Sequence, residues 1–162
     1  MSLVSADTDA FDQLSWHDNL VHGLRWEIGD PDRNEWHSRL ILDIDHILEW
    51  VCGTDSRPQF KMAPATLTFG NGTDLSIQIP DRGHGTQVSF SPLSIDRIER
   101  ERISDQRICL DRPYWRWAIR FNDPQGGLIS FGATGFHQRL RADPVLTDQQ
   151  WYPTARPRPL PF

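Results

Sequence analysis

Apolar and polar side chains alternate with a period of two along much of the chain, which is the pattern of half-buried β-strands. In residues 19–28, one face would carry Leu20, His22, Leu24, Trp26 and Ile28, and the other Val21, Gly23, Arg25 and Glu27. The cluster Gly29-Asp30-Pro31-Asp32 follows directly. Because Gly, Asp and Pro favour turns, we predict that a strand over residues 19–28 ends in this cluster.

Residues 39–50 give the strongest strand signal and contain the tightest cluster of chemically active side chains. Alternation places Leu40, Leu42, Ile44, His46, Leu48 and Trp50 on one face, and Ile41, Asp43, Asp45, Ile47 and Glu49 on the other. A helix remains open for the end of this run, because its apolar residues from Ile44 to Val51 also fit a period of 3.6.

Two β-hairpins are predicted, over residues 65–79 and 115–136. Residues 65–69 alternate, and Gly70-Asn71-Gly72 leads into residues 75–79. An Asn-Gly turn between alternating runs is a strong hairpin signal, because both residues tolerate positive φ. Residues 115–121 form another alternating run, and a turn over 122–127 leads into residues 128–136, where Gly132 and Gly135 indicate a bulge or a strong bend.

The remaining segments complete a mainly β prediction. Residues 94–106 fit a strand paired with residues 115–121, or a helix that pairs its own charges, and we favour the strand. Residues 11–16 are the best helix candidate elsewhere, over about one turn. We predict a mainly β fold, an antiparallel sandwich or strongly curved sheet of about seven to nine strands, with little helix.

Chain length and the composition of the last twelve residues predict one domain followed by a tail. The chain has 162 residues, which suits a single domain over residues 1–150. Residues 151–162 form a Pro-rich C-terminal tail, whose composition favours polyproline II or disorder. We favour a frayed end for this tail, and a strap that Trp151 and Phe162 hold against the domain or a neighbour remains open.

Charge, cysteine content and the lack of long apolar runs argue against a nucleic-acid-binding, secreted or membrane-spanning protein. The formal net charge of −5 argues against a nucleic-acid binder, which would carry a basic face. The first 18 residues contain four aspartates and no basic residue, unlike a signal peptide, and no apolar run is long enough to span a bilayer. We therefore expect a soluble, cytoplasmic protein without a membrane role, in which Cys52 and Cys109 are free thiols.

Asp43 and Asp45 follow a Leu-Ile-Leu segment, and this arrangement resembles the first motif of haloacid-dehalogenase-type phosphatases. In that family the first Asp is the nucleophile and the second acts as acid and base on phosphate. The family expects Thr where this chain has Ile47, and a phosphate-binding lysine for which Lys61 lies too close in sequence. It also has a doubly wound α/β fold, which the period-two pattern does not predict. We therefore do not predict a phosphatase.

A metal site is the better chemical alternative for this region. Mixed nitrogen and oxygen ligands are available from His17, Asp18, His22, Asp43, Asp45, His46 and His137, with Asp43, His46 and His17 as the smallest set. On a strand, however, Asp43 and Asp45 share a face while His46 points away. The interpretation that we favour pairs the carboxylates with arginines of neighbouring strands and places His46 in the core. No cofactor is expected.

Two further clusters have candidate side chains. Residues 15–19, Ser-Trp-His-Asp-Asn, contain a Ser, a His and an Asp, but a catalytic triad needs these groups to converge and adjacent residues in an extended segment point apart. Trp115 and Trp117 could form an aromatic platform for a sugar or a base, although they share a face with Ile119 and Phe121 and therefore fit the core better.

The order of these motifs resembles a group of uncharacterised small bacterial proteins. The motifs are Trp16-His-Asp-Asn19 with His22, the run 40–50, the run 63–69, Trp115-Arg-Trp117 and Gly135-Phe136. The chain is also loosely similar to mainly-β immunity proteins of bacterial toxin systems, which share a Trp-(His)-Asp opening and a following Leu/Asp strand. The resemblance covers residues 11–142 and brings no catalytic residues with it.

The predicted function is therefore binding. We expect a non-enzymatic, immunity-type β domain that binds another protein or a second copy of itself, with Trp16, His17, Asp18, His22, Asp43 and Asp45 as binding residues. Its acidic charge would steer it toward a basic partner such as a nuclease toxin. The alternatives are a metal-dependent hydrolase at the His and Asp cluster, and a small-ligand or sugar-binding domain at Trp115 and Trp117.

Overall fold

The computed structural model describes residues 5–53, 56–80, 93–104 and 112–157, and within them it forms ten strands and two short 3-10 helices. The elements in chain order are β1 (Ser5–Asp7), η1 (Thr8–Gln13), β2 (Leu20–Ile28), η2 (Pro31–Arg33), β3 (Ser38–Cys52), β4 (Pro58–Gly70), β5 (Thr73–Gln78), β6 (Leu93–Ile103), β7 (Tyr114–Asp123), β8 (Leu128–Ala133), β9 (Gly135–Leu140) and β10 (Val145–Thr147). No helix in this part of the chain is long and apolar enough to cross a membrane.

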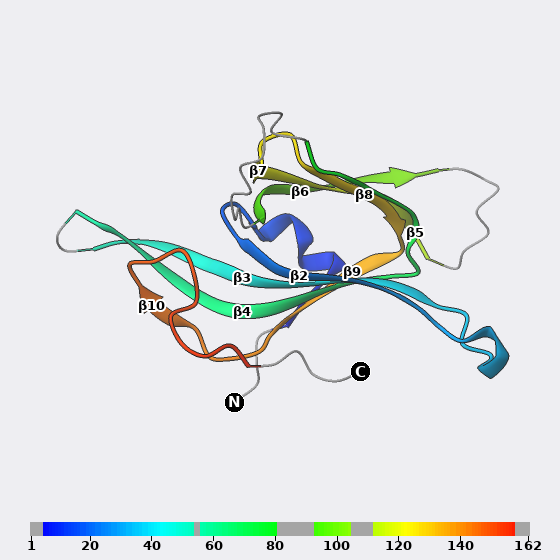
Figure 1. Cartoon of the computed structure of the whole chain (residues 1–162), viewed down its shortest axis with the longest axis horizontal. Coiled ribbons are helices and arrows are strands. Elements are labelled where there is room, and N and C mark those ends of the chain that lie inside the picture. Colours follow the sequence, from blue (N-terminus) through cyan, green and yellow to red (C-terminus); the bar gives the residue numbers. More distant parts are fainter. Residues whose placement is uncertain (1–4, 54–55, 81–92, 105–111, 158–162) are drawn as a thin grey trace, which may run out of the picture.

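The strands form one antiparallel sheet that folds over into two layers (Figure 1). The strand order is β1-β9-β4-β3-β2-β6-β7-β8-β5, and β10 pairs separately with β4. We call β1, β9, β4, β3, β2 and β10 the lower layer, and β6, β7, β8 and β5 the upper layer. The layers are joined at β2 and β6 through only two paired positions, at Leu20 and Val21, and the sheet does not close into a barrel. The predicted mainly β, antiparallel fold is confirmed.

The core fills the space between the two layers, and η1 lies there too (Figure 1). Aromatic rings dominate one part of it: Phe11, Trp16, Phe69, Trp117, Phe131 and Phe136 are all buried. Trp117 is central, with ring centroids 5.2 Å from Phe11, 5.1 Å from Phe69 and 6.0 Å from Phe136. Offset and edge-on contacts of this kind add to the stabilisation that burial of the rings provides.

The hairpin predicted across Gly70-Asn71-Gly72 is wrong. Asn71 does adopt a positive φ of 54°, and the chain does turn there. However, β3 occupies one edge of β4, and β9 and β10 occupy the other, so no edge is left for β5. The strand crosses instead to the upper layer and pairs with β8.

A second connection crosses between the layers at the same corner. The predicted return strand over residues 128–136 bends sharply at Thr134, which divides it into β8 in the upper layer and β9 in the lower layer. The Thr134 backbone N–H donates to the Gly70 carbonyl oxygen at 3.0 Å, so the two crossings are hydrogen-bonded to each other. The bend predicted from Gly132 and Gly135 is confirmed. A Cβ at Gly132 would come within 2.2 Å of the Tyr114 hydroxyl oxygen, so this close approach requires glycine.

Of the other local predictions, those for strands and turns are confirmed, and the helix prediction needs a correction. The turn after residue 28 is confirmed, and residues 93–103 form strand β6 as favoured. The end of the run 39–50 is strand throughout. The helix predicted over residues 11–16 begins earlier, at Thr8, because the Asp7 carboxylate accepts a hydrogen bond from the Asp9 N–H and caps it there.

Candidate functional site

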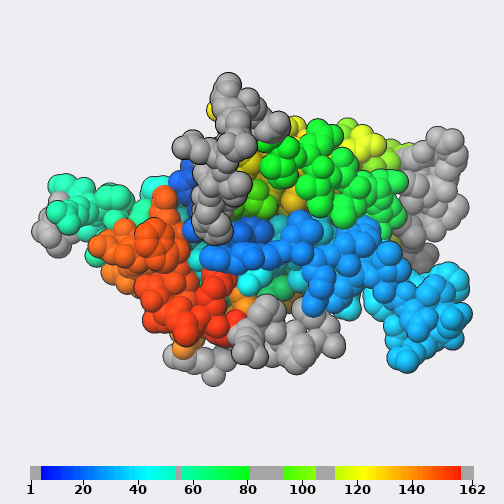
Figure 2. Space-filling view, in the orientation of Figure 1, coloured from blue at the N-terminus to red at the C-terminus, as the bar shows by residue number. Residues whose placement is uncertain are grey.

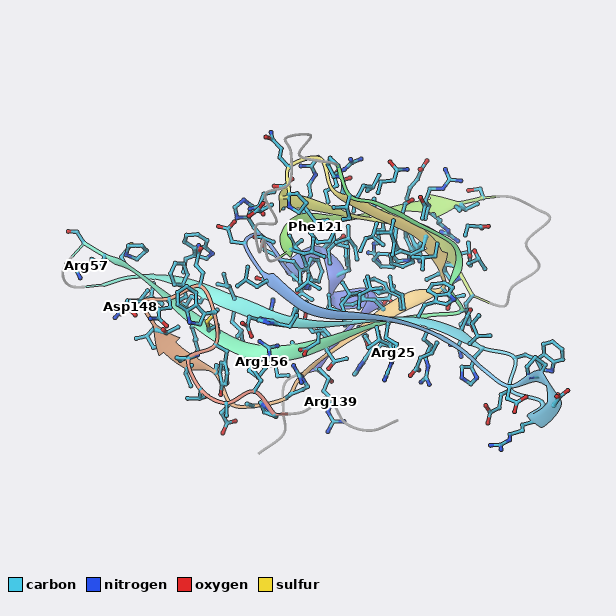
Figure 3. The ribbon with its side chains drawn as sticks, viewed as in Figure 1. Arg25, Arg57, Phe121, Arg139, Asp148 and Arg156 are labelled. Carbon is cyan, nitrogen blue, oxygen red and sulfur yellow. The ribbon has the colours of Figure 1, made fainter. Side chains whose placement is uncertain are left out.

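Asp43 and Asp45 lie on the face of β3 that is turned away from the upper layer, which we call the outer face. Both carboxylates bind Arg156, which reaches them from the C-terminal tail. Arg156 Nη2 lies 2.7 Å from Asp43 Oδ1 and 3.2 Å from the Ile44 carbonyl oxygen, while Nη1 binds Asp45 Oδ1. Figure 3 places Arg156 beneath the lower layer. The guanidinium thus spans both aspartates through its two donor nitrogens, in the planar geometry that favours Arg over Lys.

A β-bulge brings His22 to the same site. The pairing of β2 with β3 shifts between Val21 and Gly23, so His22 is an extra residue in β2. Its Nε2 lies 2.8 Å from Asp45 Oδ2. The bulge also corrects the predicted faces of β2, because Val21, not Leu20, packs into the core with Leu24 and Trp26.

Burial and neighbouring positive charge shift the pKa of Asp45 in opposite directions, and the side chain of Asp45 is only 1% exposed. Burial alone would raise its pKa, but the hydrogen bonds from His22 and from the Tyr152 backbone N–H, together with the Arg156 charge, hold the pKa below its ordinary value. Asp45 is therefore a charged group that the fold has surrounded with donors.

Arg141 completes the charge arrangement from the end of the lower layer. It follows β9, its side chain is 5% exposed, and its Nη2 binds Asp43. Its Nη1 donates to the Pro157 carbonyl oxygen at 2.6 Å. Its Nε is buried and has no hydrogen-bond partner in the described part of the chain. Two aspartates and two arginines thus meet on the outer face. Arginines of neighbouring strands were expected as partners of the carboxylates, but Arg141 follows β9 and Arg156 lies in the tail.

The tail lies against this face over residues 151–157 without forming a strand. The Tyr152 N–H donates to Asp45 Oδ2 at 3.1 Å, and Tyr152 packs on a small cluster of Ile47, Phe60 and Met62. Figure 2 shows this last described segment, orange to red, packed over the left part of the molecule. The tail is a strap, but Tyr152 and Arg156 hold it. Trp151 is 52% exposed, and Phe162 lies outside the described residues.

His46 points to the opposite face of β3 from the two aspartates. It is 4% exposed, and its Nδ1 lies 2.8 Å from Asn19 Nδ2, so the amide donates to the ring. Asn19 Oδ1 in turn accepts the Ile47 backbone N–H at 3.1 Å. Burial lowers the pKa of His46 to about 4, so the ring is neutral at pH 7.

The three residues of the smallest predicted metal set have separate partners. Asp43 binds arginines, His46 binds Asn19, and His17 lies 3.2 Å from Asp18 and 3.9 Å from Asp96 of β6. Among the residues that the structure describes, no group of three His, Cys, Asp or Glu side chains is placed to hold a metal ion.

The residues before β2 are structural anchors. Trp16 is buried, and its Nε1 donates to Gln138 Oε1 at 2.8 Å. Asp18 has a positive φ of 62° and accepts a hydrogen bond from Asn122 Nδ2 at 2.6 Å. These contacts join the segment to β9 and β7, so Trp16 and Asp18 hold the two layers together.

A groove of about 970 Å³ opens beside the β2–β3 hairpin. Its walls include the apolar side chains Ile28, Trp36, Ile103 and Tyr114 and the charged side chains Glu35, Asp74 and Arg116. Trp36 is 76% exposed and Ile28 is 74% exposed. The hairpin projects from the right of the molecule in Figure 2. None of the six residues predicted to bind lines this groove.

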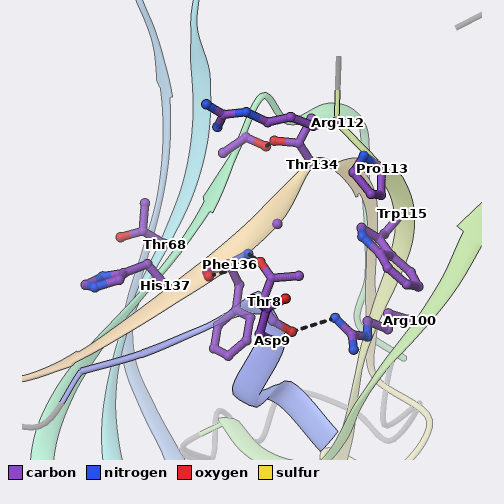
Figure 4. Close-up of a pocket in the computed structure, with 12 residues that line it drawn as sticks. Thr8, Asp9, Thr68, Arg100, Arg112, Pro113, Trp115, Thr134, Phe136 and His137 are labelled. Atoms are coloured by element: carbon purple, nitrogen blue, oxygen red, sulfur yellow. Dashed lines mark hydrogen bonds between the residues drawn. The ribbon is translucent and has the colours of Figure 1, made fainter. Parts of the chain in front are cut away.

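A smaller groove of about 580 Å³ contains Arg100 (Figure 4). Its guanidinium carbon lies 4.5 Å from the Phe11 ring centroid and 4.4 Å from that of Trp115, and Nη1 donates to the Thr8 carbonyl oxygen at 2.9 Å. Trp117 is fully buried, so Trp115 and Trp117 do not form an exposed aromatic platform.

Comparisons of the chain with protein-family models, with curated proteins and with solved structures give no match. The contacts, burial and charge of the described residues are therefore the basis for assigning a function.

Sequence reasoning missed the arginines and the aromatic groove. Arg141 and Arg156 are about a hundred residues from their aspartate partners, at separations of 98 and 113 from Asp43. The sequence carries one hint of the arginines, which is the presence of Arg156 and Arg158 in the Pro-rich tail. Trp36 stands between Glu35 and His37 in a turn region, where no alternating pattern would bury it, and its Nε1 donates to Asn34 Oδ1 at 3.0 Å.

Replacing Asp45 by Asn will destabilise the protein by about 2 kcal/mol at pH 7, because Arg156 and His22 lose their shared anion. The loss is smaller than for a fully buried pair, since both partners are partly exposed and regain water. Urea unfolding measures this loss of stability, with the exposed Asp32→Asn variant as control.

The stability that Asp45 contributes also depends on pH. Because the pKa of Asp45 lies below 3.8 in the folded state, its contribution is present above that pH and is lost as the pH falls through the pKa of the folded state. Equal stability of Asp45→Asn and wild type at pH 7 would contradict the prediction.

Proposed function

We propose that the chain is a non-enzymatic protein-binding domain that holds a basic protein partner in the groove beside the β2–β3 hairpin. The observation that carries this proposal is the exposure of Trp36 and Ile28 at a groove that the largely buried Tyr114 also lines. Trp, Tyr and Arg are the side chains that most often dominate the binding energy of protein interfaces. Trp36 and Ile28 line the same groove, and apolar side chains that are exposed together mark an interaction surface more often than single ones do.

Charge indicates the kind of partner. The hairpin tip carries Asp30, Asp32 and Glu35 against Arg33, and at the groove itself Glu35 and Asp74 outnumber Arg116. The whole chain has a net charge of −5. An acidic rim around an apolar groove accelerates association with a basic protein and disfavours acidic ones. An immunity-type inhibitor of a basic toxin fits this description.

The arrangement of the carboxylates supports binding rather than hydrolysis. Asp43 and Asp45, the best candidates for acid/base chemistry, are held by Arg141, Arg156 and His22 of the chain itself. A general base needs access to a substrate proton, and the tail covers both of these groups.

Site-specific photo-crosslinking tests this proposal. A benzoylphenylalanine at position 36, in the full chain made in its native host, will give discrete adducts with a basic protein that mass spectrometry can identify. The same residue at position 125 is the matched control, because Gln125 is also exposed but lies in the turn after β7, at the opposite end of that strand from Tyr114.

Binding of the identified protein to purified variants completes the test. Trp36→Ala will weaken affinity by roughly 30-fold, corresponding to about 2 kcal/mol, whereas Gln125→Ala will leave it unchanged. Adducts that are absent at position 36, that are equal at both positions, or that contain only an acidic protein would refute the proposal.

A further inference from the structure

We infer that the outer face around Asp43 and Asp45 is a second binding site, for an extended, arginine-bearing segment of a partner protein, and that the chain's own tail occupies this site in cis. The site shares no residue with the groove beside the β2–β3 hairpin, so the inference goes beyond the proposed function and does not depend on it.

The receiving surface belongs to the lower layer and is complete without the tail. Strand β3 supplies Asp43, Asp45 and the Ile44 carbonyl oxygen as acceptors. Arg141 follows β9 and sets the position of Asp43. The apolar floor of Ile47, Phe60 and Met62 comes from β3 and β4. All of these groups lie on paired strands or directly after one, so the surface is preorganised.

The tail shows which occupant the surface recognises. Arg156 uses two nitrogens for three acceptors, a pattern that the single ammonium of lysine does not reproduce. Four residues earlier, the Tyr152 ring covers the apolar floor and its N–H binds Asp45. The matching partner segment is therefore extended, with an aromatic residue followed by an arginine.

The tail is held in a way that permits replacement. Within residues 151–157, as the structure describes them, the backbone contacts the sheet through the Tyr152 N–H and the Pro157 carbonyl oxygen, and the segment pairs with no strand. Pro153 and Pro157 have no N–H to donate. The tail also leaves the buried Arg141 Nε without an acceptor, among the described residues. A segment that offers a carbonyl or carboxylate at that point would satisfy a donor that the tail does not.

The test uses the full-length Arg156→Ala chain and a synthetic peptide with the sequence of residues 150–157. We expect the peptide to bind this variant at least tenfold more tightly than it binds wild type, whose own tail competes for the site. A peptide with Lys in place of its Arg will bind at least tenfold more weakly. Adding Asp43→Asn and Asp45→Asn to the receptor will abolish binding. Circular dichroism of each receptor verifies that it is folded.

Wild type supplies a second measurement that needs no variant to fold. In a ¹⁵N-labelled wild-type chain, excess unlabelled peptide will shift the Tyr152 amide signal as the tail leaves Asp45, and a peptide with Ala in place of Arg will not. The inference is overturned if folded Arg156→Ala does not bind the peptide and the Tyr152 signal stays unchanged. It is also overturned if the Arg, Lys and Ala peptides bind alike. A wild-type dimer that the Arg156→Ala substitution abolishes would instead assign the site to the tail of a second copy.

Discussion

Replacing Trp117 by Ala will destabilise the protein by about 3–5 kcal/mol, the range for removing a large aromatic side chain from a core. Trp117 is fully buried, and its Nε1 donates to the Ala133 carbonyl oxygen at 3.2 Å. It packs edge-on against Phe11 of η1, Phe69 of β4 and Phe136 of β9, and so joins the upper layer to three elements across the core. Alanine leaves a cavity that these rings cannot fill without moving.

Chemical denaturation at constant pH measures this loss, with Trp50→Ala as the matched control. Trp50 is 52% exposed, so its removal will change stability by less than about 1 kcal/mol. A loss of similar size in both variants would mean that Trp117 does not join the layers.

Acidification from neutral pH to about pH 4 will remove up to about 3 kcal/mol of stability through His46 alone. The pKa of His46 is about 4 in the folded protein, against an ordinary value of 6.5. The unfolded chain therefore binds a proton at His46 between these two values and the folded chain does not. Stability from this group is complete above pH 6.5 and is lost as the pH falls toward the folded pKa.

Unfolding free energies of wild type and His46→Gln between pH 4 and pH 7.5 isolate this effect. Gln keeps an acceptor for the Asn19 amide but does not titrate, so the variant will have a shallower dependence on pH even if its stability at pH 7.5 is lower. Parallel curves for the two proteins would show that His46 is not the titrating group.

The strands could be predicted because their signal is local. Period-two alternation identified β2, β3, β7 and parts of β4 and β5, and the Asn-Gly sequence correctly marked a turn. The pairing of β5 with β8 could not be predicted from the turn. It depends on which edges of β4 are already occupied, and β9 and β10 occupy one of them from far along the chain.

The same distinction applies to the candidate site. Alternation placed Asp43 and Asp45 on one face and His46 on the other, and the structure agrees. The identity of their partners was out of reach, because the contacts between Arg156 and β3 depend on the path of a segment without secondary structure. His22 was named as a candidate beside Asp43 and Asp45, but alternation put it on the face of Leu24 and Trp26, because a one-residue bulge reverses the alternation and has no clear sequence signature.

The order in which the chain is synthesised gives the bridges between Arg156 and β3 a further consequence. Asp43 and Asp45 precede Arg156 by 113 and 111 positions. Synthesis from the N-terminus therefore makes the residues of β3 well before Arg141 and Arg156. The two carboxylates gain the arginines that neutralise them only when nearly all of the described chain has been made.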